Sequence, residues 1–395
     1  MSKILILTVD GGGIKGIIPS YFLEQLESAS AMGLPCYQIF DIIGGTSTGG
    51  IIATALTSPL LSNGTEVVEP MTASDIFAMY KNNGDKIFVS QEFADFKYVS
   101  LYYGDDGNGN GIEPYLQSIY QSYSLNDAKN NMEQVLQGRT KHVFTTSYTI
   151  NSSGGVVNKP QKGSDYGPYL FNWLDASNPS DDYLVWEAAR ATSAAPTFFP
   201  VANLGGGQGA NSQANERWAL DGGVMSNNPA IWAISEAFRT QLVSSLSDIV
   251  LVSLGTGTYP GGAGLVTAHQ GDPDPDNGNW GEAPWLASDL YDLTGVENGD
   301  GAIIKIITEA VQLVSSQQIL GLESSGLSYY RLEPTITQAQ SQMDNISKSN
   351  VDSLIQTATD YLNGTEGSAI FTAIVNELTS IIDSNSEVAS KKQLQ

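Results

Sequence analysis

A strand-to-helix turn at residues 40–56 constrains the fold of this chain more than any other stretch. The sequence there is FDIIGGTSTGGIIATAL, in which an apolar run, a glycine-rich turn and a second apolar run follow one another. We predict a strand over residues 39–43 and a helix over residues 49–56. Between them lies Ser47 in the pattern G-x-S-x-G, which holds a serine on a sharp elbow with its hydroxyl exposed.

The residues around Ser47 fit such an elbow. Gly45 and Gly49 occupy positions where a side chain would block the turn and the approach of a substrate. Thr46 and Thr48 complete the elbow, and the helix behind it directs its N-terminus toward the hydroxyl. The pattern is weak by itself in a chain with 41 glycines, so its interpretation depends on the other motifs.

A second glycine motif, DGGGIKG, occupies residues 10–16 after a predicted strand at residues 4–9. Glycines between a strand and a helix present backbone N–H groups to a phosphate or to the oxyanion of acyl transfer. The motif also satisfies G-x-G-x-x-G, but a dinucleotide fold needs an acidic residue about 20 residues later. Glu24 and Glu27 come too early and Asp41 too late, which favours acyl transfer.

A third motif, LDGGVMSNNP at residues 220–229, offers a base for Ser47. Asp221 ends a short predicted strand and is followed by Gly222 and Gly223. A hydroxyl needs a base within hydrogen-bond reach to become a nucleophile. The Asp221 carboxylate could accept the proton of Ser47 directly.

The two histidines leave an alternative open. His142 precedes a predicted strand, whereas His269 lies in a loop rich in glycine and proline. The order Ser47, Asp221, His269 matches that of the α/β-hydrolase triad. A Ser–Asp dyad and a triad with His269 are therefore both compatible with the residues.

The net charge of −24 at pH 7 limits the partners of the chain. Such a surface repels nucleic acid and anionic lipid headgroups, so we expect no nucleic-acid partner, and a lipid substrate would enter through apolar contact. Cys36 is the sole cysteine, which excludes an intramolecular disulfide and suits a reducing compartment. The opening MSKILILTVDGGG lacks a signal-peptide pattern, and no stretch approaches the about 18 apolar residues of a membrane span. We expect a cytoplasmic protein, with export by another route left open.

The opening order of strand, helix, strand and helix predicts an α/β fold. We expect a three-layer sandwich with a central, mostly parallel sheet and helices on both faces. Further predicted strands cover residues 143–150, 219–221 and 249–254, and further helices cover residues 74–80, 183–195, 229–242 and 302–319.

A change of composition near residue 333 suggests a second unit. We predict a catalytic domain over residues 1–332 and a helical C-terminal extension over residues 333–395, packed on it. The first helix of the extension is expected to be capped by Ser349 or Asn350 and to stop at residues 363–364, and a second helix covers residues 369–382.

Other features carry less weight. The loop at residues 104–111 resembles half of a calcium loop, but its twelfth position is Gln117 instead of glutamate, so we expect no metal. Residues 258–300 are read as a long functional loop, with exposed acidic residues near 272–276. Phe198 and Phe199 could line an acyl channel or pack in the core. The segment 280–285, which begins and ends with tryptophan, and the helix at 302–319 could meet a lipid surface or be core.

Together the motifs resemble those of the patatin family of lipid acyl hydrolases, which is related to the catalytic domain of cytosolic phospholipase A2. The matching blocks are DGGGIKGIIP at 10–19, FDIIGGTSTGG at 40–50, ATSAAPTFFP at 191–200, LDGGVMSNNPA at 220–230, LVSLGTG at 251–257 and MDNISKSNVDSLI at 343–355. They occur in family order and cover nearly the whole chain.

The resemblance implies a serine carboxylic-ester hydrolase without a catalytic histidine. Ser47 would be the nucleophile and Asp221 the base, in a reaction that passes through an acyl-enzyme without a cofactor or metal. The glycine turn would form the oxyanion hole, with Gly11, Gly12, Gly13 and Ile14 as its members. The expected partner is an acyl lipid such as a phospholipid, galactolipid or simple ester, met in transient contact with a membrane or micelle, and no stable protein partner is implied. A storage or lipid-binding protein with residual esterase activity and an acyltransferase are the alternatives.

Overall fold

The computed structural model describes residues 3–29, 33–62, 66–89, 110–152, 166–205, 217–260 and 302–393. The strands of its main sheet are β1 (Ile4–Val9), β2 (Ile42–Thr46), β5 (His142–Ser152), β6 (Gly167–Asn172), β7 (Ala202–Leu204), β8 (Arg217–Asp221), β9 (Ile249–Leu254) and β10 (Ser328–Leu332). Their order is β10-β9-β1-β2-β5-β8-β7, and β6 also pairs with β5. The pairs from β10 to β5 are parallel, whereas β6, β7 and β8 pair antiparallel. A short hairpin, β3 (Leu60–Ser62) and β4 (Glu66–Val68), lies apart from this sheet.

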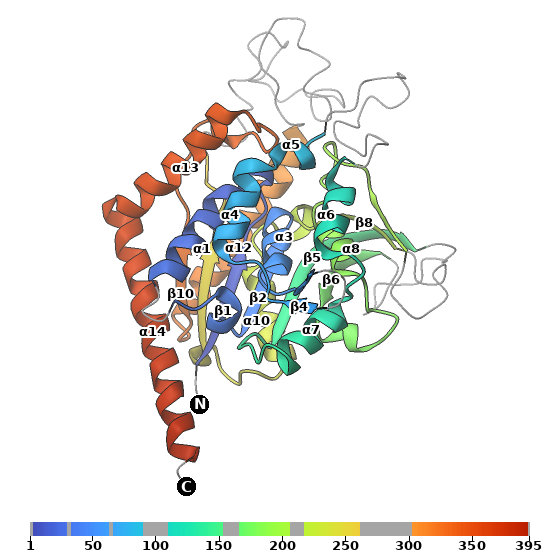
Figure 1. Ribbon diagram of the computed structural model, residues 1–395. Helices are drawn as coiled ribbons and strands as arrows, with labels where there is room; N and C mark the ends of the chain where they lie inside the picture. The colour runs from blue at the N-terminus through green and yellow to red at the C-terminus, as the bar shows by residue number, and fades with distance from the viewer. Residues whose placement is uncertain are drawn as a thin grey trace, which may run out of the picture.

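Helices cover both faces of the sheet (Figure 1). On one face lie α1 (Ile17–Ala29), α3 (Thr48–Ala55) and α4 (Ala73–Asn82), and on the other lie α10 (Ala230–Arg239) and α12 (Ala302–Glu323). Side chains alternate along β1, so that Leu5 and Leu7 join the larger core whereas Ile6 joins the smaller one. The predicted three-layer α/β sandwich with a mostly parallel sheet is confirmed.

The remaining helices surround the antiparallel strands and the edges of the sheet. They are α2 (Cys36–Ile39), α5 (Gly84–Ile87), α6 (Ile112–Tyr120), α7 (Leu125–Gln134), α8 (Val185–Thr192) and α9 (Gly223–Ser226), with single 3-10 turns at Gly13–Gly16, Asp175–Ser177, Leu246–Asp248 and Ala339–Ser341. Helices α6, α7 and α8 gather beside β5 and β6 in Figure 1. Among the described residues, no helix combines the length and the apolar composition that a bilayer span requires.

The last part of the chain adds two helices at the β10 edge of the sheet. Helix α13 (Lys348–Asn363) packs against α1, and α14 (Thr365–Gln393) contacts both α13 and β10 (Figure 1). The division of the chain at residue 333 stays a prediction. The predicted cap of α13 was wrong by two residues, because the hydroxyl of Ser347 accepts the Asn350 N–H and the helix already includes Ser349.

The strand predicted over residues 39–43 was also placed too early. Ile39 ends the single turn α2, and β2 covers Ile42–Thr46. Periodicity alone cannot separate a short apolar strand from a buried helical turn. The correction matters for the site, because β2 now runs directly into Ser47.

Candidate active site

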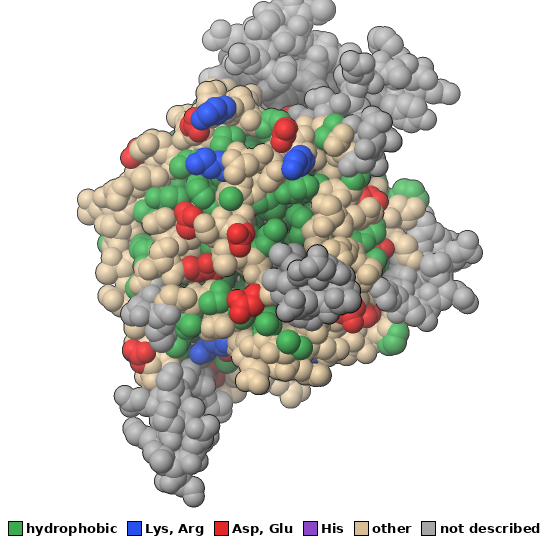
Figure 2. Space-filling view, viewed as in Figure 1, with side chains coloured by type: hydrophobic (Ala, Val, Ile, Leu, Met, Phe, Trp, Pro, Cys, Tyr) green, Lys and Arg blue, Asp and Glu red, His purple; other side chains and the backbone are tan. Residues whose placement is uncertain are grey.

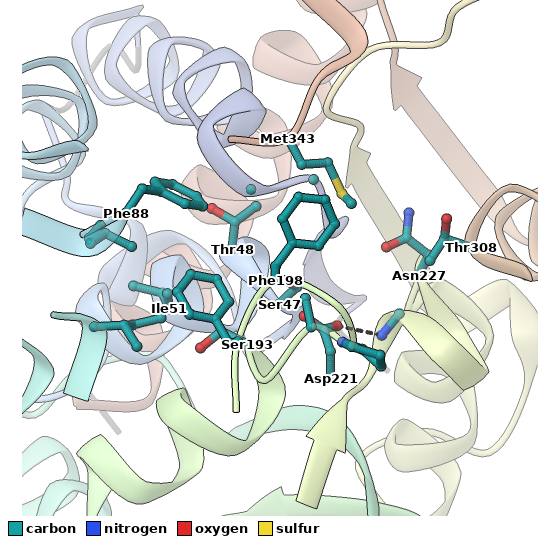
Figure 3. Close-up of a pocket in the computed structure, with 18 of the residues that line it drawn as sticks. Ser47, Thr48, Ile51, Phe88, Ser193, Phe198, Asp221, Asn227, Thr308 and Met343 are labelled. Carbon is teal, nitrogen blue, oxygen red and sulfur yellow. Dashed lines mark hydrogen bonds between the residues drawn. The ribbon is translucent and has the colours of Figure 1, made fainter. Parts of the chain in front are cut away.

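Strand β5 brings the Ser47 elbow and the third motif together. Along one edge it pairs with β2 up to Thr146 and then, from Ser147 onward, with the antiparallel strand β8. Both must share that edge, because β6 pairs with β5 on either side of this junction and occupies the opposite edge. Since β2 ends at Thr46 and β8 ends at Asp221, the carboxyl ends of the two strands meet there. Ser47 and Asp221, far apart in sequence, therefore lie side by side (Figure 3).

Ser47 sits on the predicted elbow. Its φ of 53° and ψ of −123° are an unusual conformation for a residue with a side chain. A Cβ at Gly45 would lie 2.0 Å from the Gly49 carbonyl oxygen, and one at Gly49 would lie 2.1 Å from that of Val9. The elbow thus packs too tightly against itself and against β1 to accept a side chain at either glycine.

The threonines beside Ser47 anchor the elbow. The Thr46 hydroxyl lies 2.6 Å from the Thr146 hydroxyl and donates to the Ser226 carbonyl at 2.6 Å. The Thr48 hydroxyl bonds with the Tyr80 hydroxyl. Both threonines are buried and hold the backbone of the turn, whereas Ser47 is half-buried and lines a cavity.

Asp221 is a buried carboxylate with two donors. The Gly223 N–H donates to it at 2.7 Å. Burial raises the pKa of Asp221 to about 7, while a hydrogen bond with the Ser47 side chain, the Gly223 N–H and the charge of Arg190 act to lower it. A carboxyl with this pKa exchanges protons near neutral pH, which suits a general base.

Two residues to which the sequence analysis gave no role support this pair. The Thr192 hydroxyl accepts the Ser47 N–H at 2.9 Å, and its carbonyl accepts the Gly222 N–H at 3.2 Å, so Thr192 links the two motifs. Arg190 is 3% exposed and donates to the Pro200 carbonyl at 2.7 Å, and its Nε lies 3.9 Å from the Glu113 carboxylate. Within the described ranges, its Nε and Nη1 form no hydrogen bond. Burial lowers the pKa of Arg190 to about 10, which still leaves it charged beside Asp221.

The four predicted oxyanion-hole residues differ in which N–H groups are available. Gly11 donates to the Asn227 carbonyl at 3.1 Å and Ile14 to the Met343 carbonyl at 2.8 Å. Within the described part of the chain, the N–H groups of Gly12 and Gly13 donate to no residue. Both glycines line the same cavity as Ser47, so they are the two amides able to meet a ligand oxygen.

The peptide between Gly11 and Gly12 has a fixed orientation. Its carbonyl accepts the Thr256 hydroxyl at 2.7 Å and the Asn227 amide at 3.5 Å. The C=O and N–H of a trans peptide point in opposite directions. The Gly12 N–H therefore points away from Thr256, a residue that the Ser47 cavity does not include.

The Ser47 cavity is largely apolar. Its walls include the side chains of Ile51, Ile87, Phe88, Ile112, Pro196, Phe198, Phe199, Val224 and Met343. In Figure 3, Phe198 lies over Ser47 and Asp221, and Met343 points toward the same ring. Phe198 and Phe199, predicted to line a channel or to pack in the core, do both, because each is buried and forms part of the wall. Such a cavity suits a hydrocarbon chain.

Of the other sequence candidates, His142 and Gln117 lie away from the site. His142 is the first residue of β5, before the junction with β8 at Ser147, and its Nε2 lies 2.8 Å from Glu236 Oε2. Gln117 belongs to helix α6. His269, the acidic run near 272–276, the segment 280–285 and residues 104–109 lie outside the described residues. In the described ranges, no group of three potential metal ligands occurs.

The model of the patatin-like phospholipase family matches residues 7–234 of the chain. Patatin-T5 of Solanum tuberosum is 28% identical to it, over 91% of this chain and 83% of the relative. Patatin-like protein 2 of Arabidopsis thaliana is 29% identical over the same shares, 91% and 83%. A third relative, named probable inactive patatin-3-Kuras 1, of Solanum tuberosum, is 30% identical over 73% of this chain and 70% of its own length.

Proposed function

The chain belongs to the patatin-like phospholipase family, and we propose that it hydrolyses carboxylic ester bonds of acyl lipids through a dyad of Ser47 and Asp221. Lipid acyl hydrolysis is the general activity of this family. The observation that carries the dyad is the meeting of β2 and β8 on one edge of β5, which sets the Ser47 hydroxyl against the Asp221 carboxylate.

Acylation uses both residues and the glycine turn. The Ser47 oxygen attacks the acyl carbonyl carbon while its proton passes to Asp221. The carbonyl oxygen becomes an oxyanion that the N–H groups of Gly12 and Gly13 bind, a type of interaction worth about 3 kcal/mol for each donor. The carbon–oxygen bond to the alcohol then breaks, and the alcohol leaves with the proton from Asp221.

Deacylation repeats these steps with water as the nucleophile. Asp221 accepts a proton from water, the hydroxide oxygen bonds to the acyl carbon, and the fatty acid leaves as Ser47 recovers its proton. The acyl chain occupies the apolar cavity throughout, since its wall carries the hydrophobic side chains. We expect the substrate to be reached in transient contact with a membrane or micelle.

The test is Ser47→Ala, assayed with p-nitrophenyl butyrate and a fluorophosphonate probe. Without its nucleophile the enzyme should lose at least about 10⁴-fold in kcat and all labelling, with an unchanged melting temperature. Ser193→Ala is the matched control: Ser193 lines the same cavity, but its hydroxyl donates to the Ala189 carbonyl at 2.7 Å, so activity should stay within a few fold.

Two outcomes would change the proposal. An active Ser47→Ala enzyme would remove the dyad. A wild-type protein that is never labelled and turns over no ester would instead support a lipid-binding protein, the second candidate, which the name of one relative as probably inactive favours. Acyl transfer to an added alcohol in place of water would identify an acyltransferase.

A further inference from the structure

A second cavity adjoins the glycine turn. It shares Gly12, Asn227, Thr308 and Met343 with the apolar cavity but includes neither Ser47 nor Asp221. The two cavities therefore meet beside Gly12, one of the two amides available to an oxyanion.

The walls of the second cavity have a different chemistry. Among its described lining residues, those whose side chains can donate or accept hydrogen bonds are Lys15, Asn227, Thr256, Thr258, Tyr259, Thr308, Glu309, Gln312 and Ser341. Hydroxyl and amide groups are thus more frequent in the second cavity than in the first, although the apolar side chains of Pro260, Leu313, Ile336 and Met343 also line it.

We propose that this second cavity binds the alcohol portion of the ester, and that this portion is an uncharged polyhydroxy group such as a glyceryl or glycosyl unit. The inference rests on the proposed function. With the acyl chain in the apolar cavity and the carbonyl oxygen at Gly12 and Gly13, the alcohol must extend from the acyl carbon to a different side. The second cavity offers such a side, because Gly12 also forms part of its wall.

The charges of the second cavity favour an uncharged group. Its described walls carry one basic side chain, Lys15, and one acidic side chain, Glu309, so their formal charges cancel. Glu333 lies directly behind Gly257, whose N–H it accepts at 2.6 Å, and is itself paired with Arg331. Phosphate sites in proteins usually combine several cationic or N–H donors, whereas the described part of this wall has a single cation.

The net charge of the whole protein also favours an uncharged alcohol. The chain has a net charge of −24, which repels an anionic headgroup at moderate ionic strength. On the face shown in Figure 2, acidic side chains are scattered, and the basic ones form no patch. A polyhydroxy alcohol experiences no such repulsion and matches the hydroxyl and amide groups of the wall.

The experiment compares octanoyl esters that differ in the alcohol: glycerol, methyl glucoside and glycerophosphoglycerol, with p-nitrophenyl acetate as reference. For the wild type, kcat/KM should be at least tenfold higher for the two uncharged alcohols than for the phosphate-bearing one. The Thr258→Trp substitution fills the second cavity from its rim. It should lower the ratio of kcat/KM for the glycerol ester to that for p-nitrophenyl acetate at least tenfold.

Thr335→Trp is the matched control. Thr335 pairs with Thr258 in an isolated bridge and is exposed like it, but it does not line the cavity. The ratio should be unchanged in this variant. Glu309→Lys should raise kcat/KM for the phosphate-bearing ester relative to the glycerol ester about tenfold, since it adds a cation to the wall.

Three results would overturn the inference. The first is an equal loss in Thr258→Trp for all esters, and the second is a wild-type preference for the phosphate-bearing ester. The third comes from calorimetry on the Ser47→Ala protein, where Thr258→Trp should weaken binding of glycerol monooctyl ether at least tenfold, and unchanged binding would contradict the site. Because that measurement needs no turnover, it tests the second cavity even if the proposed hydrolysis fails.

Discussion

Two aspartates in this molecule share a local sequence but not an environment. Asp10 follows β1 and Asp221 ends β8, and each is followed by glycines, of which Gly12, Gly13 and Gly223 line the same cavity. Both are buried, and burial raises the pKa of each. The motif Asp-Gly-Gly is therefore no guide to which carboxylate reacts.

Their partners differ. Arg331 donates to the two oxygens of Asp10 at 3.1 Å and 2.6 Å, so this carboxylate is neutralised by a fixed cation. Among the described residues, the donors to Asp221 are the Gly223 amide and the Ser47 hydroxyl, and Arg190 acts on it through its charge. A carboxylate paired with arginine is a poor proton acceptor, whereas one bonded to a hydroxyl can take that proton. We therefore expect Asp10 to have a structural role and Asp221 to be the proton acceptor.

The largest contrast should come from substituting each aspartate with asparagine. Asp221→Asn removes the base and should lower kcat/KM for p-nitrophenyl butyrate at least about 10³-fold. Because the folded pKa of Asp221 is raised, ionisation destabilises the folded state as pH rises from about 4 toward 7. The melting temperature of the variant minus that of wild type should therefore be larger at pH 8 than at pH 5.

Asp10→Asn should mainly affect stability. It weakens the two hydrogen bonds from Arg331, which keeps Glu333 as a second carboxylate partner. The loss should be about 1–3 kcal/mol in the free energy of unfolding, measured in urea. Replacing Arg331 with methionine in the same protein should recover part of that loss. A stable Asp10→Asn enzyme with activity as low as that of Asp221→Asn would reverse the two roles.

The pH profile refines the contrast through Arg190. Asp221 must be ionised to accept a proton, so kcat/KM should rise with pH through about 7. Since the charge of Arg190 lowers the pKa of Asp221, Arg190→Gln should move this midpoint upward and lower the rate at pH 6 by up to about tenfold. Arg139→Gln, which breaks an ion pair with Asp41, is the control, and an equal shift there would remove the assignment.

The smallest expected effect concerns Thr256, whose hydroxyl donates to the Gly11 carbonyl, between Asp10 and the Gly12 amide. Thr256→Val removes the hydroxyl that orients the peptide of Gly12 and should lower kcat about fivefold, with KM within a factor of two. Thr256→Ser should restore kcat. A change in KM alone would mean that Thr256 contacts substrate and does not position the turn.

Local features of the fold were predictable from the sequence. The elbow at Ser47 and strand β9 depend on neighbouring residues, and their patterns identify them. The turn α2 was missed because an apolar run of this length suits either a strand or a helix. The antiparallel strands β6 and β7 were not predicted, since they depend on pairing with β5 and β8.

The site was predictable only in part. The positions of Ser47 and Asp221 followed from motifs, but the competition for N–H groups in the glycine turn did not. It depends on Asn227, Thr256 and Met343, which come from distant segments and whose backbone or side-chain atoms meet the turn only in the folded chain. Thr256 and Met343 lay in blocks of family resemblance, which drew attention to them without giving a role.

The contacts that hold the glycine turn come from late in the chain, which affects when the turn can form during synthesis. Arg331 holds the residue before the turn, and the Met343 carbonyl holds Ile14 within it, so the turn near the first residues is completed by residues more than 300 positions later. During translation, the elbow and Asp221 leave the ribosome well before Arg331 and Met343. A chain ending near residue 332 would keep the elbow, the glycine turn and Asp221 but would lack the Met343 contact, so we expect the glycine turn to be completed only after residue 343 has been made.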